Sequence, residues 1–403
     1  MGVIFIKFFV INSGSSTLKY KIFDENKNCL LKGTFDNLNS DKLVNVTQEN
    51  YNKKIYKENF RSDDYHHIFN KVKDLILDSN FGVINNLEEI SAVGHRVVHG
   101  GTFFKNSVII TKTVEGEIEK LVELAPLHNR ANLNGILACE KIFKNIPQIA
   151  VFDTNFYSKL PEISYILGIP YEYYEKYNIR KYGFHGISHK YVIEKYSEMS
   201  GKDTKNLKII SCHLGNGSSI TAVNNNKVVD TSMEFTPLGG FIMGTRSGSI
   251  DPSIVTYLAK KENLDFSEIE NILNKKSGLL GISGISSDKR LIMSSLESNK
   301  RAKLAFDIFI YQITKYIGGY ITLLKGLDVL IFTGGIGENQ YLHREKIGEN
   351  LGFLNLNLNQ KLNKITVLGR EGKISSDNSK IDVFVISTNE ELAILNEILK
   401  LII

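Results

Sequence analysis

The sequence predicts a duplicated α/β fold, in which two domains begin with similar β-hairpins. The 403-residue chain is long for one ordinary core, so two domains are expected. An apolar strand, the polar turn at 12–16 and an alternating strand follow one another from Val3 to Asp24, and the pattern recurs from Ile209 to Val223. Small turn residues offer backbone N–H groups to phosphate oxygens. The pair of turns therefore predicts two halves that face one another across a phosphate, although neither turn is a Walker loop.

Composition excludes several classes of protein. Apolar residues make up 42% of the chain and charged residues 23%, as in ordinary globular proteins. The net charge of +5 is spread along the sequence, which gives no reason to expect nucleic acid. Three cysteines without a Cys-x-x-Cys pair fit a reduced cytoplasm. The apolar stretch at 3–11 is short and contains Lys7, so a buried strand is expected there and no membrane span.

The first half alternates strands and helices. Apolar periodicity and turn residues predict these elements in order: a strand at 3–11, a strand at 18–24, an insertion of strands and loops at 37–64, a helix near 68–76, a strand at 90–98, a helix near 114–122, a loop at 125–129, a helix at 131–143 and a strand at 148–152. The last strand delivers Asp153 at its C-terminal end, where ligands sit in open α/β sheets.

The second half follows the same scheme. After the second hairpin, the sequence predicts a helix starting at Asp251-Pro252, a glycine-rich loop at 277–284, a long helix near 306–324, a strand at 328–333 leading into a Gly-rich loop at 334–339, a strand at 381–387 and a last helix to 402. Without a low-complexity linker, the domains are expected to touch closely.

Two arginines are candidates for anion binding. Arg96 ends a buried strand, where a cation is costly unless it is paired. A structural ion pair and an anion clamp are equally compatible with that position. Arg246 lies among small residues in Met243-Gly-Thr-Arg-Ser-Gly248, a loop that would contribute little to a hydrophobic core, so anion binding is favoured.

Three further positions are candidates for chemistry. A lone histidine is more often a core residue, but His185 has glycines nearby at 183 and 186, which favours close ligand approach. Asp153 is the best candidate carboxylate, with a turn or cap role as the alternative. Glu390 opens a helix, where it would stabilise the dipole or bind a divalent metal together with phosphates. His95 and His99 lie in strand-like sequence, which argues against a zinc site.

Several motifs in order resemble the acetokinase family over nearly the whole chain. They are Asn12-Ser-Gly-Ser-Ser16, Val93 to Gly101, Ala125 to Asn129, Phe152-Asp-Thr154, Tyr182 to Gly186, His213 to Gly217, Met243 to Gly248, Phe332 to Asn339 and Thr388 to Glu391. The resemblance implies two ribonuclease-H-like domains of the actin-like ATPase superfamily, facing a central cleft. The first domain would comprise 1–154 plus 389–403 and hold the acyl substrate. The second, 155–388, would bind nucleotide and form a homodimer.

The resemblance also implies the reaction and its residues. The family reaction is reversible phosphoryl transfer from ATP to acetate, giving acetyl phosphate and ADP, with Mg²⁺ or Mn²⁺. By motif position the catalytic residues would be Asp153, Arg96, His185 and Arg246, and the metal residues Asn12 and Glu390. The nucleotide residues would be Lys19, His213, Leu214, Gly215, Asn216, Gly217, Asp288, Lys289, Arg290, Gly335, Ile336, Gly337, Glu338 and Asn339. The acyl pocket would be lined by Arg96, Val98, Leu127, Phe184 and Pro237.

Some positions depart from the family pattern. Thr17 stands where Ser is expected, Arg130 where Pro is expected, Tyr157 where His is expected and Ser249 where Asp is expected. Glu234 and Gly239 also differ from the pattern. None of these positions is a proposed catalytic residue. The departures therefore concern the geometry of the loops and the preference for an acyl chain.

Three functions are alternatives to acetate kinase activity. The first is a propionate or butyrate kinase, which only the acyl pocket would distinguish. The second is a non-catalytic nucleotide-binding regulator on the same fold, but such a chain should have lost Arg96, His185 or Arg246, and all three are present. A sugar kinase is disfavoured because a neutral hydroxyl acceptor would not explain two pocket arginines.

Overall fold

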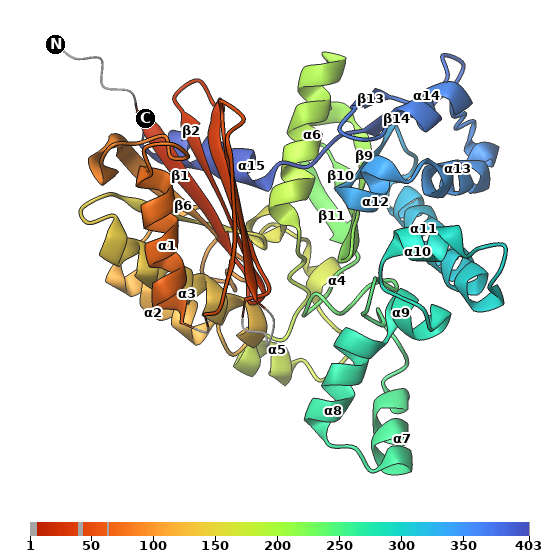
Figure 1. Cartoon of the computed structure of the whole chain (residues 1–403). Coiled ribbons are helices and arrows are strands. Elements are labelled where there is room, and N and C mark those ends of the chain that lie inside the picture. Colours follow the sequence, from red (N-terminus) through yellow and green to blue (C-terminus); the bar gives the residue numbers. More distant parts are fainter. Residues whose placement is uncertain (1–5, 39–42, 63, 403) are drawn as a thin grey trace. The chain divides into compact units, whose positions relative to one another are not determined.

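The computed structural model describes residues 6–38, 43–62 and 64–402, so residues 3–5 of the first expected strand lie outside the described part. The chain divides into two compact units, Met1–Ser158 with Asn389–Ile403, and Lys159–Thr388. Each unit is built on one sheet (Figure 1).

The first unit contains an eight-stranded sheet in the order β5-β4-β3-β2-β1-β6-β8-β7. Its strands are β1 (Lys7–Ser13), β2 (Thr17–Asp24), β3 (Cys29–Asp36), β4 (Val44–Asn50), β5 (Ile55–Phe60), β6 (Ile90–Val97), β7 (Val108–Ile109) and β8 (Gln148–Phe152). β1 and β2 form the expected antiparallel hairpin, and β1, β6 and β8 run parallel. The insertion at 37–64 supplies β4 and β5, which extend the sheet at one edge.

The second unit repeats this pattern. Its six-stranded sheet has the order β11-β10-β9-β12-β14-β13. The strands are β9 (Lys208–Leu214), β10 (Ser218–Asn224), β11 (Lys227–Thr231), β12 (Val329–Thr333), β13 (Gly372–Lys373) and β14 (Asp382–Val385). β9, β10 and β11 form an antiparallel meander, while β9, β12 and β14 run parallel, as β1, β6 and β8 do in the first unit. The duplicated fold predicted from the two hairpins is therefore confirmed.

Helices connect the strands in both units. They are α1 (Tyr65–Leu77), α2 (Lys112–Lys120), α3 (Pro126–Ile142), α4 (Glu162–Tyr165), α5 (Glu172–Tyr177), α6 (Gly186–Ser200), α7 (Ser253–Glu262), α8 (Phe266–Asn271), α9 (Gly278–Ser283), α10 (Lys289–Ser294), α11 (Lys300–Leu324), α12 (Gly334–Asn339), α13 (Tyr341–Asn350), α14 (Gln360–Ile365) and α15 (Glu390–Ile402). Single turns occur at η1 (Leu87–Glu89), η2 (Asn155–Tyr157), η3 (Thr204–Asn206), η4 (Ile272–Lys276) and η5 (Gly352–Leu354). Among the described helices, none is long and apolar enough to cross a membrane.

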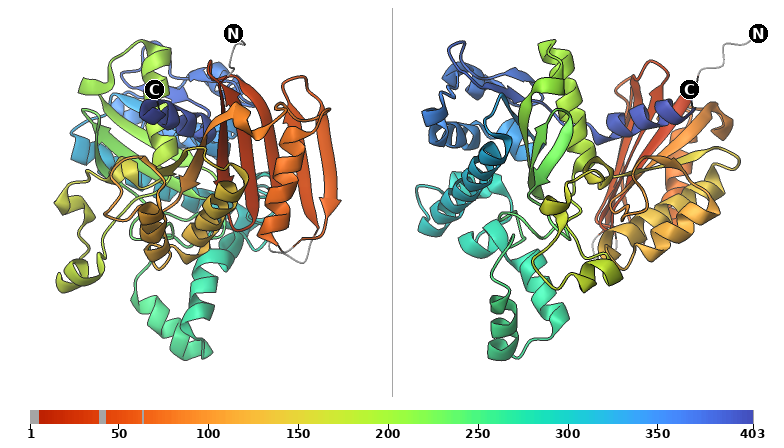
Figure 2. Two further views of the ribbon diagram at one scale, coloured as in Figure 1. Left: turned by 90° about the vertical axis from the view of Figure 1, so that its left-hand side faces the viewer. Right: turned by 180° about the vertical axis from the view of Figure 1, so that it is seen from behind.

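The parallel strands of the first unit are buried on both faces. α3 packs on one face of β6, and α15 packs on β6 and β1 (Figure 2). Gly94 is required on the α15 side, because a Cβ there would lie 2.6 Å from side-chain atoms of Ile394 and Ile398. Burial on both faces agrees with the nearly continuous burial of the residues of β6 and β8.

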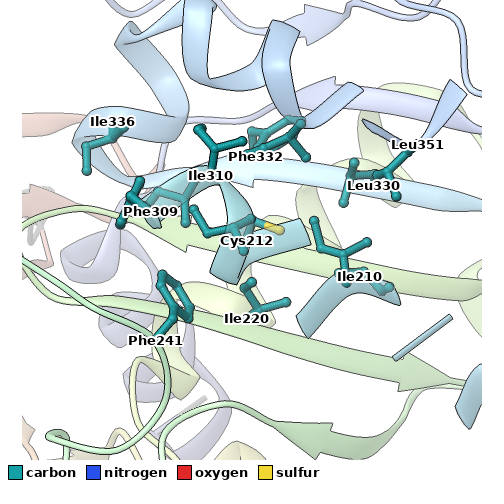
Figure 3. Packing of buried hydrophobic residues seen from close by; sticks show 14 of the residues in the cluster. Ile210, Cys212, Ile220, Phe241, Phe309, Ile310, Leu330, Phe332, Ile336 and Leu351 are labelled. Carbon is teal, nitrogen blue, oxygen red and sulfur yellow. The ribbon is translucent and has the colours of Figure 1, made fainter. Parts of the chain in front are cut away.

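The second unit has its largest core between its sheet and α11. Ile210, Cys212 and Ile220 point from β9 and β10 toward Phe309 and Ile310 of α11 (Figure 3). These strand residues alternate with polar ones, so the opposite face of the hairpin is polar. α6 lies against that side of β9 (Figure 1).

Three segments expected to be loops are helical. Residues 125–129 contain the start of α3, which Pro126 opens at the first helical position, where a missing N–H costs nothing. Residues 278–283 form α9, because Leu279 is buried in the core while Gly278 and Gly284 adopt positive φ at its two ends. Residues 334–339 form α12, with Ile336 buried. In each case tertiary burial outweighs the loop signal of glycine or proline.

Candidate functional site

The first group of predicted site residues meets at the ends of parallel strands. β1 carries Asn12, β6 carries Arg96, and Asp153 follows β8 directly. Because β1, β6 and β8 are neighbours that run parallel, their C-terminal ends lie together. Glu390 joins them from the first turn of α15.

Arg96 is the centre of this group. Its Nε and Nη2 donate to the two carboxylate oxygens of Asp153 at 3.3 and 2.5 Å. Its Nη1 donates to Asn12 Oδ1 at 3.4 Å, and its Nε lies 3.3 Å from Glu390 Oε2. The side chain of Asp153 is 1% exposed and that of Arg96 18% exposed. Arg96 is therefore paired, as a buried cation must be, yet it retains an exposed edge.

The charges of this group perturb one another. Burial lowers the pKa of Arg96, but the attraction of Asp153 and Glu390 outweighs it and holds that pKa above its usual value. Burial raises the pKa of Asp153, Arg96 lowers it, and Glu390 raises it further, so the net direction is upward. A perturbed carboxylate that pairs with an arginine at a strand end is typical of a functional site.

Two asparagines that the sequence analysis missed hold these strand ends. Asn132 of α3 accepts from Val98 N at 3.0 Å and donates to Ser13 O at 2.7 Å, thereby joining the ends of β1 and β6. Asn129 accepts from His99 N and donates to His99 O, both at 2.9 Å. Asn129 belongs to the quoted motif at 125–129, which was the signal available in the sequence.

The second group lies in the other unit and meets at Gly217. His185 precedes α6 with φ of 59°, and Arg246 comes from the loop before α7. A Cβ built on Gly217 would lie 3.3 Å from Arg246 Nη1 and 3.4 Å from His185 Nε2. Glycine at 217 therefore lets a cation and an imidazole converge over the turn between β9 and β10. His213 stacks on His185 with ring centroids 4.3 Å apart.

Arg246 is oriented by its own loop. Its Nη1 donates to Pro237 O at 3.3 Å, and its backbone O accepts from Met243 N at 3.0 Å. Burial lowers the pKa of Arg246. Gly278, which the sequence analysis did not single out, has φ of +62°, and a Cβ there would lie 2.6 Å from Arg246 O. A side chain at 278 would therefore displace the arginine loop.

α12 brings the other Gly-rich motif to the end of β9. A Cβ on Gly334 would lie 2.7 Å from Leu214 O. Glu338 Oε1 accepts from Gly334 N at 2.9 Å and Thr388 N at 3.1 Å, so it holds the start of its own helix. Arg344, fully buried and also missed, donates to Gly337 O and Glu338 O, both at 2.8 Å.

The remaining predicted residues are distributed as follows. Lys19 lies on β2 in an open pocket with Lys21, Lys32, Glu49 and Glu391. Asp288 and Arg290 pair at 2.7 Å at the start of α10. Of the acyl-pocket residues, Val98 and Leu127 belong to the first unit, and Phe184 and Pro237 belong to the second. The side chains of Leu127 and Lys289 lie outside the described part.

Three departures from the family pattern contact one another. A Cβ on Gly239 would lie 2.9 Å from Glu234 Cβ, so the glycine makes room for that side chain. Ser249 Oγ donates to Glu234 Oε1 at 3.2 Å, where an aspartate would repel the same carboxylate. Glu234 O accepts from Tyr182 N at 3.0 Å, just before His185. The three residues therefore form one cluster beside the segment that leads to His185. Of the other three, Arg130 pairs with Glu119 on the surface, Tyr157 is buried, and Thr17 begins β2.

Buried neutral histidines predict that acid destabilises the first unit. Burial lowers the pKa of His95 to about 4 and that of His99 to about 3. Both pKa values lie below the pKa of roughly 6.5 that a histidine has in an unfolded chain. The stability gained by burying the neutral rings is therefore present above pH 6.5 and is lost as the pH falls toward 4. We expect a loss of about 2 kcal/mol per histidine at pH 5. Asp153, whose pKa is raised, binds protons on folding in acid and offsets part of it.

Thermal unfolding between pH 7.5 and 5 measures this loss. His95→Gln, which keeps a hydrogen-bonding group opposite Gln148 Oε1, should flatten the pH dependence by about 2 kcal/mol. His66→Gln, at an exposed position on α1, is the matched control and should leave it unchanged. Equal slopes for all three proteins would show that His95 is not held neutral.

The duplicated sheets, with a donor-rich hairpin in each unit, define the two-domain fold of the actin-like ATPases. The Acetokinase family model matches residues 7–396, and the chain belongs to that family. The acetate kinase of Halothermothrix orenii is 48% identical over 399 residues, which cover 98% of this chain and 100% of that protein. The acetate kinase of Thermoanaerobacterium thermosaccharolyticum is 49% identical over 401 residues, 98% of this chain and 99% of that one.

Solved structures agree in fold. The crystal structure of Porphyromonas gingivalis acetate kinase matches with a TM-score of 0.92 at 40% identity, covering 98% of this chain and 100% of that one. A propionate kinase from Francisella tularensis matches with a TM-score of 0.90, also at 40% identity, covering 97% and 98% of the two chains.

Proposed function

We propose that this chain is an acetate kinase, which transfers the γ-phosphoryl group of ATP reversibly to acetate, giving acetyl phosphate and ADP. The observation that carries this assignment is its 48–49% identity to acetate kinases over almost the whole length of both chains. Retention of Arg96, His185 and Arg246 argues against a non-catalytic regulator. The propionate kinase match keeps propionate as the second candidate, since its identity equals that of the acetate kinase structure.

The proposed mechanism relies on electrostatic stabilisation. Acetate is already an anionic nucleophile at neutral pH, so the chain need not supply a strong base. The difficulty is to bring two anions together and to spread charge over the phosphoryl oxygens. In this proposal Arg96 binds the acetate carboxylate or the transferring group, and Asp153 fixes the plane of its guanidinium by two hydrogen bonds. Arg246 and His185 donate to the phosphoryl oxygens in the transition state.

The oxygen atoms near Arg96 fit a magnesium ion bound mainly through phosphates and water. Asn12 offers an amide oxygen and Glu390 a carboxylate, both of which are hard ligands that Mg²⁺ accepts. The described residues contain no group of three His, Cys, Asp or Glu side chains able to hold a metal. When bound, the ion would neutralise phosphate charge.

Glu390→Ala is therefore expected to raise the Mg²⁺ concentration needed for half-maximal activity by about tenfold or more, since even outer-shell partners contribute 10–100-fold to metal affinity. The measurement is a Mg²⁺ titration of activity. Glu391→Ala is the matched control, because that neighbouring carboxylate pairs with Lys21 at 3.0 Å. A titration midpoint unchanged by Glu390→Ala would show that Glu390 serves only Arg96 and the helix dipole.

Purified protein with ATP, Mg²⁺ and hydroxylamine tests the proposed function. Acyl phosphate should be trapped as hydroxamate, with kcat/KM highest for acetate, lower for propionate and lowest for butyrate. Each added methylene changes binding by only about 1–3 kcal/mol, so propionate should remain a measurable substrate. No hydroxamate from any acid would refute a carboxylate kinase, and a higher kcat/KM for propionate would establish the second candidate.

Two further properties concern assembly and location. Family resemblance favours a homodimer through the second unit, which light scattering would measure. The free state of Cys29, Cys139 and Cys212 favours a cytoplasmic location, since disulfides are rare there.

A further inference from the structure

The hairpin of β9 and β10 buries a polar face. Ser211 and His213 of β9 lie opposite Thr221 and Ser219 of β10, so the four side chains share one side of the sheet. Ser211, Ser219 and Thr221 are 0% exposed, as deeply buried as the apolar residues on the other face. A sheet face covered by a helix is normally apolar, since buried hydroxyls cost free energy unless they are hydrogen-bonded. These polar residues of β9 and β10 therefore have a role other than hydrophobic packing.

The hydroxyls on this face form a chain with two histidines of the α6 segment. Ser211 Oγ lies 3.0 Å from His189 Nδ1, and His189 Nε2 lies 2.8 Å from Ser219 Oγ. Ser219 Oγ lies 2.9 Å from His185 Nδ1. His189 is 0% exposed and comes one helical turn after His185, so both rings reach the same strand face. Both ring nitrogens of His189 are thus engaged by serines.

Few arrangements of protons satisfy all the hydrogen bonds from Ser211 through His189 and Ser219 to His185. Ser219 has a single hydroxyl proton and lies between two ring nitrogens. Burial, with a smaller contribution from His213, lowers the pKa of His189 well below its usual value, so that ring is neutral and carries one N–H. If His189 Nε2–H donates to Ser219, the serine proton is directed to His185 Nδ1, and a neutral His185 then carries its proton on Nε2. The reverse order would place the proton on His185 Nδ1.

The position of His185 Nε2 favours the first order. That atom would lie 3.4 Å from a Cβ on Gly217, beside Arg246 Nη1 at 3.3 Å. A nitrogen that stabilises anionic phosphoryl oxygens must donate a hydrogen bond, whereas a bare Nε2 would repel them. Only the order that begins at His189 Nε2–H keeps a neutral His185 as a donor at that atom.

We propose that His189 and Ser219 are positioning residues that hold His185 in its Nε2–H tautomer, with Ser211 fixing His189 from the other side. The proposal deepens the proposed function and rests on it, because phosphoryl transfer is the reason why His185 needs a proton on Nε2. His189 and Ser219 contact no reacting atom in this account. They act through His185 alone.

Long-range ¹H–¹⁵N correlation spectra of ¹⁵N-histidine-labelled protein test the proposal without substrate. The chain has nine histidines, and the signals of His185 can be assigned from their loss in His185→Gln. At pH 8 the wild type should show His185 protonated on Nε2 and bare on Nδ1. Ser219→Ala should give a mixture of tautomers. A wild-type His185 protonated on Nδ1, or a tautomer that Ser219→Ala leaves unchanged, would overturn the proposal.

Kinetics of matched variants supply the second readout. Ser219→Ala and His189→Leu should lower kcat about 10- to 100-fold, less than the 10²–10³ typical of losing a donor itself, while both KM values change less than about twofold. His189→Gln retains an N–H donor near Nε2 and should restore most of kcat. Thr231→Val removes another fully buried hydroxyl from this hairpin region and should change neither readout. Equal losses in His189→Gln and His189→Leu would contradict the tautomer account.

The two readouts separate this proposal from the proposed function. A wild type without activity toward any acid would refute the kinase assignment, whereas the tautomer spectrum would still decide the hydrogen-bond order. Should His189→Leu fail to fold, Ser219→Ala with its spectrum is sufficient.

Discussion

Arg246→Ala should lower kcat by about 10³-fold or more, with little change in KM for ATP. Arginines that contact a transferring phosphoryl group contribute about 10³–10⁵ to turnover, because charge develops on its oxygens in the transition state. Arg246 has the required setting. Its Nη1 lies beside Gly217 and His185, and Pro237 O fixes its direction. The loss should therefore appear in catalysis rather than in nucleotide affinity.

Two variants sharpen that test by steady-state kinetics. Arg246→Lys keeps the charge but loses the planar fork, so it should recover only part of kcat. Arg370→Ala removes an exposed arginine from the same unit and should leave kcat within about twofold. Turnover of Arg246→Ala equal to that of the wild type would refute the role given to this residue.

Arg96→Ala should abolish most activity and also destabilise the first unit by about 3–5 kcal/mol. Removing one partner of a buried ion pair leaves the other charge without compensation. Here Asp153 and Glu390 both remain, and Asp153 is the deeply buried one, with a side chain that is 1% exposed. Burial already raises the pKa of Asp153 while Arg96 is present, and loss of the guanidinium should raise it further. Part of the penalty should therefore be relieved at acidic pH by protonation of Asp153.

A double-mutant cycle separates the two effects. In Arg96→Ala with Asp153→Asn, the uncompensated carboxylate is gone, so the free energy of unfolding should return toward that of the wild type. Activity should not return, because the anion clamp is still missing. Denaturant unfolding and the hydroxamate assay measure the two quantities. A double variant as unstable as Arg96→Ala would show that Asp153 is not the source of the instability.

Local patterns predicted much of the architecture. The two hairpins were predicted because alternating strands flank short polar turns at Asn12–Ser16 and Gly215–Gly217. Arg96 was predicted to need a partner because of its place at a buried strand end, and Asp153 provides it. The glycines at 183 and 186 favoured close ligand approach at His185, which stays a prediction, and the left-handed backbone of His185, whose φ is 59°, was not expected. Such features depend on a few adjacent residues and a known cost of burial.

Other features depend on distant segments and were not predictable. The polar positions Ser211 and Ser219 look like the solvent side of a half-buried hairpin, and only the packing of α6 shows that they are buried. Glycines around 277–284 indicated a loop, but burial of Leu279 makes the segment a helix. The fit between Glu234 and Gly239 depends on tertiary contact, since neither residue alone suggests the other. The role of Asn132 likewise depends on backbone groups far along the sequence, at Val98 and Ser13.

The most direct test of the account follows the oxygen atom that accepts the phosphoryl group. Acetate labelled with ¹⁸O in its carboxylate is incubated with ATP, Mg²⁺ and the enzyme, and the acetyl phosphate formed is observed by ³¹P NMR. Attack by the carboxylate on the γ-phosphorus predicts an acetyl phosphate signal that carries the ¹⁸O isotope shift, together with an equal amount of unlabelled ADP. ADP without acetyl phosphate, or acetyl phosphate whose bridging oxygen is unlabelled, would contradict the proposed transfer.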